Sequence, residues 1–199
     1  MSDKELLRDF IGKYGFSVGS FTLTSGLTSN YYFDIKTIGL NPKGNYLISK
    51  VLWKLLEIDL IDKSEHVTHL NFDALCGLEF GAVPIMSGFS LYAFMTKGVT
   101  CSSLVVRKDK KGYGEENKIE GLKSITGTKV IIIDDVVTTG ASIAKTYKAC
   151  QDNGLHVLKL MAVVDCQEGG RELIKDECDG LCLDPIFTKE QLGGVHDIT

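Results

Sequence analysis

Two adjacent carboxylates, Asp134 and Asp135, stand between a run of β-branched residues and a stretch of small ones. The run at residues 130–133 is typical of a buried strand, because strands of a parallel sheet are apolar on both faces. Residues 136–140 predict a tight loop, and a helix-forming run opens at Ala141. A loop that enters a helix offers backbone N–H groups and the positive end of the helix dipole to an anion. The segment therefore predicts an anion-binding turn flanked by two carboxylates.

Carboxylates beside an anion site suit a ligand that carries a phosphate next to hydroxyl groups, as a 5-phosphoribosyl group does. A P-loop would need a lysine in this loop, and a dinucleotide site would need three spaced glycines where only Gly140 stands. A strand whose aspartates merely cap a helix remains an alternative. It does not account for Thr138, Thr139 and Ser142 being small together, and small side chains let a ligand approach the backbone.

The composition is that of an ordinary globular chain. The 199 residues are 44% hydrophobic and 24% charged with a net charge of −4, which favours one domain over residues 1–199 and argues against nucleic-acid binding. The N-terminus is not a signal peptide and no apolar run is long enough to span a membrane, so we expect a cytoplasmic protein without a membrane partner. The six cysteines form no C-x-x-C pair, which predicts free thiols and no zinc site or other protein metal site.

The elements that position this loop follow from periodicity. Residues 2–13 predict a helix with a capping box, and residues 21–24 and 31–35 predict two short strands. An amphipathic helix is expected from Pro42 to about Ile61. The residues expected on its apolar face are Tyr46, Leu47, Val51, Leu55 and Ile58.

Strands and helices then alternate. Strands are expected from residue 73, at 101–107, at 130–135 and at 156–165, with helices from Pro84 and over 141–153. This alternation predicts an α/β fold with a mostly parallel sheet flanked by helices on both faces. Residues 1 to about 40 precede this alternation. We expect them to form a small cap, called the hood below, over the carboxyl edge of the sheet. Open α/β sheets bind their ligands at that edge.

Two further segments could hold other parts of a charged ligand. Residues 73–84 predict a strand, a loop with Gly77 and Gly81 and a helix start, which is either an ordinary connection or a second anion site. Residues 107–121 place four cations ahead of two glycines. They predict either a solvated loop or a lid that brings positive charge to a leaving diphosphate and excludes water. These cations are Arg107, Lys108, Lys110 and Lys111.

Three aromatic residues, Tyr31, Tyr32 and Phe33, follow the polar turn of the hood. They could stack on a planar base or simply pack the hood's own core, and for any one of them both interpretations stay open.

In this order the segments resemble the orotate phosphoribosyltransferase family along nearly the whole chain. The matching motifs are F-x-L-x-S-G, G-x-x-x-G-x-x-P, R-K-x-x-K-G-x-G, I-E-G, DDVVTTG and, at residues 164–169, V-D-x-x-E-G. The DDVVTTG motif indicates the wider type I phosphoribosyltransferases, whereas the first and last motifs point to the orotate branch. The resemblance implies the type I fold with a hood, and transfer of phosphoribosyl from phosphoribosyl diphosphate to orotate. It also implies a homodimer whose lid reaches the neighbouring subunit's site.

The resemblance also implies residue roles. Lys111, Asp134 and Asp135 would be catalytic, with Mg²⁺ held mainly through phosphoribosyl diphosphate. Binding of that donor would involve Thr24, Phe80, Gly81, Arg107, Lys108, Lys111, Tyr113, Asp134, Asp135, Val136, Val137, Thr138, Thr139, Gly140, Ala141 and Ser142. The base would lie against Tyr32, Phe33, Thr138 and Cys166.

Three positions depart from the family pattern. Thr24 stands where the family usually has a lysine, and Cys166 stands where it usually has an arginine that fixes the orotate carboxylate. Tyr113 replaces a frequent histidine. The departures at Thr24 and Cys166 keep two alternatives open. One is a phosphoribosyltransferase for another base in a salvage reaction. The other is a non-catalytic regulator that binds phosphoribosyl diphosphate.

Overall fold

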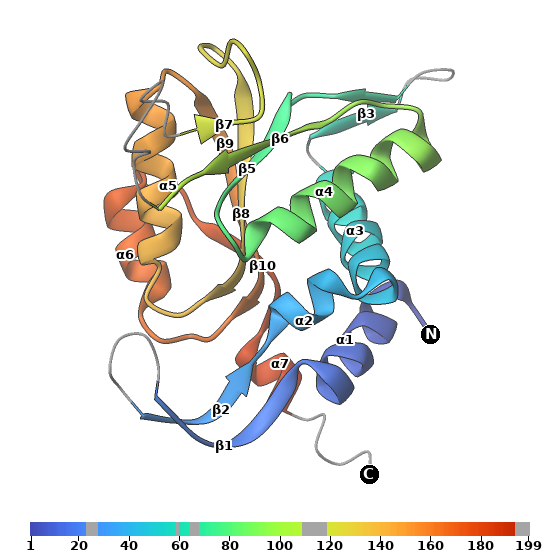
Figure 1. Cartoon of the computed structure of the whole chain (residues 1–199), viewed down its shortest axis with the longest axis vertical. Helices are drawn as coiled ribbons and strands as arrows, with labels where there is room; N and C mark the ends of the chain where they lie inside the picture. The colour runs from blue at the N-terminus through green and yellow to red at the C-terminus, as the bar shows by residue number, and fades with distance from the viewer. Residues whose placement is uncertain (23–27, 59, 64–67, 109–118, 194–199) are drawn as a thin grey trace.

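A six-stranded sheet forms the centre of the computed structural model, which describes residues 1–22, 28–58, 60–63, 68–108 and 119–193 (Figure 1). The strand order is β10-β9-β8-β5-β6-β7, and every neighbouring pair is parallel except β6 and β7. The predicted, mostly parallel sheet is therefore confirmed. Its strands are β5 (Ala74–Leu78), β6 (Ser102–Val106), β7 (Ile119–Glu120), β8 (Lys129–Val137), β9 (His156–Asp165) and β10 (Leu183–Thr188).

Helices cover both faces of this sheet, as predicted (Figure 1). In β8, Ile131 and Ile133 join the core cluster of the N-terminal helices, whereas Val130 and Ile132 join the cluster of α5 and α6. Alternate side chains of one strand thus serve two cores, which is why the run reads as continuously apolar. The helices are α1 (Asp3–Tyr14), α2 (Ile35–Leu40), α3 (Pro42–Leu56), α4 (Ala82–Tyr92) continuing into the π-helical turn η1 (Ala93–Lys97), α5 (Ala141–Asp152), α6 (Gly170–Glu177) and α7 (Lys189–Gly193). No helix in the described part of the chain is long and apolar enough to cross a membrane.

The N-terminal region begins as predicted and then differs. Ser2 and Glu5 form the expected capping box at the start of α1. The two strands, β1 (Phe16–Thr22) and β2 (Thr28–Phe33), pair antiparallel, and β1 begins earlier than predicted. The prediction of a strand up to residue 35 is wrong at its end, because the Asp34 carboxylate accepts hydrogen bonds from the backbone N–H and hydroxyl of Thr37 (3.2 and 2.7 Å) and caps α2.

The long helix α3 is shorter than predicted. It ends at Leu56 rather than near Ile61, which instead opens a short hairpin of β3 (Ile61–Lys63) and β4 (Thr68–Leu70). Its predicted face is also partly wrong, because Tyr46 and Ile58 are 51% and 81% exposed. The helix packs against both α1 and α4, so its buried face is wider than the predicted stripe and points in a different direction. The residues of that buried face are Leu47, Ile48, Val51, Leu52, Trp53 and Leu56.

Candidate functional site

A cleft of about 620 Å³ opens at the carboxyl ends of β5, β8 and β9, the edge expected for ligand binding. It is bordered by β2 and α2 of the hood on one side and by the start of α5 on the other. The described residues that line it are 31–33, Lys36, 78–81, Lys108, 134–142, Cys166 and Glu168. The cleft thus brings together the predicted anion turn, the second loop, both aromatic residues assigned to the base and Cys166.

The adjacent carboxylates are nearly buried. Asp134 and Asp135 are 7% and 8% exposed, and the Asp135 backbone N–H donates to Asp134 Oδ1 (3.0 Å). Burial first, and then the charge of Asp135, raises the pKa of Asp134 well above its ordinary value. A buried like-charged pair of this kind suits a ligand that donates hydroxyl hydrogens or brings positive charge. Among the described residues, no cluster of three or more His, Cys, Asp or Glu side chains is placed to hold a metal ion.

Lys36 is a site residue that the sequence did not reveal. Its Nζ lies 3.6 Å from Asp135 Oδ2, and the negative charge of Asp135 raises the lysine's pKa. Lys36 belongs to α2 of the hood, about a hundred positions before Asp135 in the chain. No local pattern marks it, because the contact depends on how the hood packs over the sheet.

The predicted turn has the geometry of an anion site. The strand β8 continues to Val137, two residues further than expected, and the turn at residues 138–140 leads into α5. Gly140 is the N-cap with φ 82°, and a Cβ there would lie 2.7 Å from the Gly170 carbonyl oxygen. No side chain of the described residues caps α5, and Gly140, Ala141 and Ser142 line the cleft, so the first turn of α5 can offer its N–H groups to an anionic ligand.

The second loop approaches the carboxylates closely. A Cβ on Gly81 would lie 2.3 Å from Asp135 Oδ1, so this position admits only glycine unless Asp135 moves. The neighbouring Phe80 is 56% exposed and lines the cleft. The Lys108 backbone N–H donates to Glu79 Oε1 (2.8 Å), which ties the start of the predicted lid to this loop.

Aromatic, sulfur and carboxylate side chains of β2 and of the residues after β9 also line the cleft. This group, called the base end below, consists of Tyr31, Tyr32, Phe33, Cys166 and Glu168. The Tyr31 hydroxyl donates to Glu168 Oε1 (2.5 Å), a contact that sequence reasoning missed. Tyr32 is 40% exposed, whereas Phe33 is 6% exposed and packs its ring 4.9 Å from that of Phe16. Burial raises the pKa of the Cys166 thiol to about 12, so the thiol is neutral at physiological pH.

The four predicted lid cations differ in what the structure shows of them. Lys108 lines the cleft. Arg107 is not among the lining residues and its guanidinium pairs with the Glu120 carboxylate of the adjacent strand β7 (2.7 Å). The lid cations Lys110 and Lys111 lie outside the described residues. So do Thr24 and Tyr113, which were also assigned to donor binding.

Known proteins resemble this chain over almost its whole length. The family model described as "Phosphoribosyl transferase domain" matches residues 56–195. Orotate phosphoribosyltransferase of Aquifex aeolicus is 39% identical over 195 residues, covering 96% of this chain and 98% of that protein. That of Pyrococcus horikoshii is 38% identical, covering 87% and 84%. The structure of Mycobacterium tuberculosis orotate phosphoribosyltransferase in complex with 5-phospho-α-D-ribosyl 1-diphosphate superposes with a TM-score of 0.73 at 26% identity, covering 96% and 99%.

Proposed function

Because this chain belongs to the orotate phosphoribosyltransferase family, we propose that it transfers phosphoribosyl from phosphoribosyl diphosphate to orotate. The products are orotidine 5-monophosphate and diphosphate, a step of pyrimidine biosynthesis. The observation that carries this proposal is the single cleft that joins the buried Asp134–Asp135 pair and the open start of α5 to an aromatic end. A phosphate, two ribose hydroxyls and a planar base are the groups that these three surfaces suit.

On the donor side, the backbone amides of residues 136–142, from the end of β8 through the turn to the first turn of α5, bind the 5-phosphate. Asp134 and Asp135 accept hydrogen bonds from the ribose hydroxyls. Phe80 and Gly81 border the diphosphate, with Gly81 giving it access to the backbone. The donor roles of Thr24 and Tyr113 remain those implied by the family resemblance.

The reaction is a displacement at C1 of the ribose. The bond from C1 to the diphosphate oxygen breaks, a ring nitrogen of the base bonds to C1, and positive charge develops on the ribose in between. The protein needs no nucleophile of its own, because its task is to stabilise charge and to hold the two reactants in line. The carboxylates of Asp134 and Asp135 stabilise the cationic ribose. Lys108 and Lys111 stabilise the departing diphosphate, and Arg107 joins them when it leaves Glu120.

Mg²⁺ fits this donor side. The raised pKa of Asp134 reflects two carboxylates buried together, with Lys36 of the described residues as their cationic partner, and an added cation is stabilising in that setting. Asp134 and Asp135 would hold the ion through ribose hydroxyls or water. When bound, Mg²⁺ neutralises the diphosphate charge and orients the leaving group.

The wider setting is part of the same proposal. Residues 1–199 act as one phosphoribosyltransferase domain with about 1–40 as its hood, since Leu7, Ile11 and Phe33 share a core cluster with Ile131 and Met161 of the sheet. The chain acts in the cytoplasm, where reduced thiols persist, and all six cysteines are free. It binds small substrates rather than nucleic acid or membrane, and it acts as a homodimer.

Initial rates with phosphoribosyl diphosphate, Mg²⁺ and a panel of bases test the proposal. We expect orotidine 5-monophosphate to form from orotate, and no turnover of uracil at equal concentration. Turnover of an uncharged base with none of orotate would move the function to a salvage reaction, which the neutral thiol of Cys166 favours. Binding of phosphoribosyl diphosphate without turnover of any base would indicate a regulator.

A further inference from the structure

Lys189 is placed beside the base end by the register of the sheet. The parallel strands β9 and β10 align Asp165 with Thr188, so the next residues, Cys166 and Lys189, leave neighbouring strands at the same level. The backbone N–H of Glu190 donates to Gln167 Oε1 (3.2 Å), which joins the start of α7 to the loop after β9. Lys189 is therefore fixed next to a residue that lines the cleft, although it is far from it in sequence.

The ammonium of Lys189 already interacts with the base end. Its Nζ lies 4.0 Å from the centre of the Tyr31 ring, and its charge lowers the pKa of the Cys166 thiol against the larger effect of burial. A cation–π contact with a partly exposed ring is weaker than a charge-assisted hydrogen bond to a carboxylate. A small rotation of the flexible lysine stem can therefore exchange the first contact for the second when an anionic base is bound.

The charges around the cleft leave this end in need of a cation. Glu168 contributes a carboxylate that accepts from Tyr31, and Cys166 contributes no charge. The two lysines that line the cleft among the described residues lie elsewhere, since Lys36 pairs with Asp135 and Lys108 starts the lid. Without Lys189, the carboxylate of an acceptor base would be repelled by Glu168 and would gain no charge interaction from the neutral thiol of Cys166.

We infer that Lys189 is the specificity-determining cation of the base end, binding the carboxylate of an anionic acceptor base from the start of α7, beside Cys166. The inference rests on the proposed function and deepens it by assigning the charge that selects orotate over an uncharged pyrimidine. It also makes the pair of positions 166 and 189 a unit, in which a cation at either one serves the same carboxylate.

The test compares Lys189→Met, which keeps the apolar stem, with the matched surface variant Lys175→Met on α6. We expect Lys189→Met to raise KM for orotate by about 10- to 100-fold, as expected for one lost charge-assisted hydrogen bond. The KM for phosphoribosyl diphosphate and kcat at saturating orotate should stay near the parent values. Lys189→Arg should retain a low KM for orotate, and Lys175→Met should match the parent throughout.

Adding Cys166→Arg to Lys189→Met should restore a low KM for orotate, which a purely structural role of Lys189 would not produce. Lys189→Gln provides a second, polar variant should Lys189→Met not fold. An active parent whose KM for orotate is unchanged in both Lys189 variants would overturn this inference alone. A parent that is stabilised by phosphoribosyl diphosphate yet inert towards orotate would overturn the orotate function and this inference with it.

Discussion

At the scale of single residues, Asp134 and Asp135 show how position divides the roles of identical side chains. Asp135 faces Lys36, whereas Asp134 is the carboxylate whose pKa is raised by burial and by its neighbour. The sequence identified both residues from the strand–loop–helix pattern, since that signal is local. The contact of Asp135 with Lys36 depends on a hood residue, and the sequence offered no sign of it.

The buried charge of Asp134 is predicted to cost stability in the free protein. A folded pKa above the unfolded value means that no penalty exists below the unfolded pKa, and that the penalty grows as pH rises through the folded pKa. Asp134→Asn should therefore raise the free energy of unfolding at pH 7 by about 1 kcal/mol. The gain should shrink as pH falls towards about 3.9, the ordinary aspartate value.

Urea unfolding of parent and Asp134→Asn across pH checks this gain, and a differential scan with phosphoribosyl diphosphate and Mg²⁺ checks its functional cost. The ligand should raise the melting temperature of the parent, and the double change Asp134→Asn with Asp135→Asn should abolish most of that rise. A double variant that the ligand stabilises as strongly as the parent would contradict the assignment of the ribose site.

Gly81 gives a steric prediction at the same scale. An alanine Cβ would lie 2.3 Å from Asp135 Oδ1, so Gly81→Ala must displace that carboxylate. We expect weaker binding of phosphoribosyl diphosphate by about tenfold or more, the size of one lost hydrogen bond to a charged group. Gly39→Ala is the matched control, because its Cβ would make only ordinary contacts of 3.5 Å or longer. Isothermal titration of both variants with phosphoribosyl diphosphate measures the two affinities. Equal affinities would show that the loop around residue 81 accommodates the added methyl group.

At the scale of elements, the accuracy of the predictions followed the strength of the local signal. The strand β9 has its predicted bounds and α5 lies within one residue of them, since β-branched runs and a small-residue loop set both. The elements α6, β10 and α7 were not predicted. The segment that forms them contains Gly170, Pro185 and short apolar stretches without a clear period. The strand β10 is stabilised by its pairing with β9 rather than by local strand propensity.

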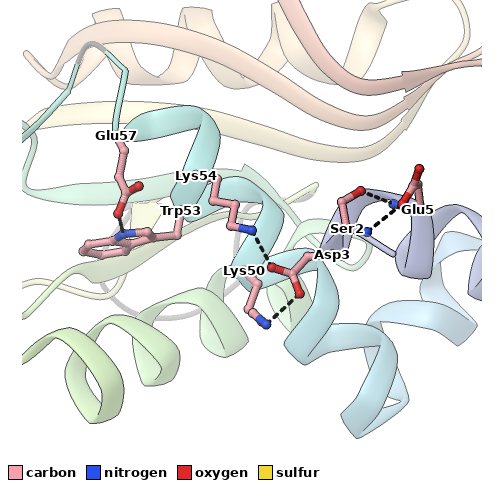
Figure 2. Close-up of polar contacts among 7 residues, drawn as sticks. All are labelled: Ser2, Asp3, Glu5, Lys50, Trp53, Lys54 and Glu57. Carbon is pink, nitrogen blue, oxygen red and sulfur yellow. Dashed lines mark hydrogen bonds and ion pairs between the residues drawn. The ribbon is translucent and has the colours of Figure 1, made fainter.

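The attachment of α1 to α3 also escaped sequence reasoning. Figure 2 shows the Asp3 carboxylate between Lys50 and Lys54 of α3, at 2.6 Å from each ammonium. On the same helix, the Trp53 indole N–H donates to Glu57 (Figure 2). These ionic contacts hold the first helix of the hood against the helix that packs on α4.

The Asp3 contacts predict a pH-dependent contribution to stability. Hydrogen bonding to Lys50 and then to Lys54 lowers the pKa of Asp3, so the contribution is present above the unfolded value of about 3.9 and is lost as pH falls through the lower folded value. Asp3→Asn should lower the free energy of unfolding at pH 7 by about 1 kcal/mol, the upper range for solvent-exposed pairs.

A double-mutant cycle of Asp3→Asn and Lys54→Met separates this ion pair from the position of Asp3 in the first helical turn. Chemical denaturation at pH 7 and again near pH 3 provides the four free energies. A coupling energy that is zero at pH 7, or one that persists at low pH, would rule out the ionic contact as the cause.

At the scale of the whole molecule, the site exists only because distant segments meet. Lys36 of the hood, the loops after β5 and β8, and Glu168 beyond β9 converge on one cleft. Sequence motifs identified the loops, each of which lies within a dozen residues. The contacts between segments, such as Lys36 with Asp135 and Tyr31 with Glu168, arise from packing over more than ninety positions and carry no local signature.

The assembly of two such molecules is the last prediction. Leu91 and Met95 are 64% and 70% exposed and border an apolar groove of about 520 Å³ on α2, α3, α4 and η1, which Leu40 and Tyr46 also line. An apolar surface of this kind is expected to be buried against a second copy through a two-fold interface. Met95→Glu should therefore shift the protein from dimer to monomer in light scattering, whereas Lys175→Glu on α6 should leave it unchanged.

Subunit mixing then tests whether the dimer matters for catalysis. Lys111→Ala should lower kcat by about 100-fold, as for one lost transition-state contact. A variant carrying Asp134→Asn and Asp135→Asn should be inactive because it lacks the ribose site. If Lys111 acts in the neighbouring subunit's site, an equal mixture of the two variants forms mixed dimers with one intact site, restoring about a quarter of the parent activity. Adding Met95→Glu to both variants should abolish that recovery. A mixture no more active than its components would show that each subunit completes its own site. Recovery that survives Met95→Glu would show that the subunits meet through another surface.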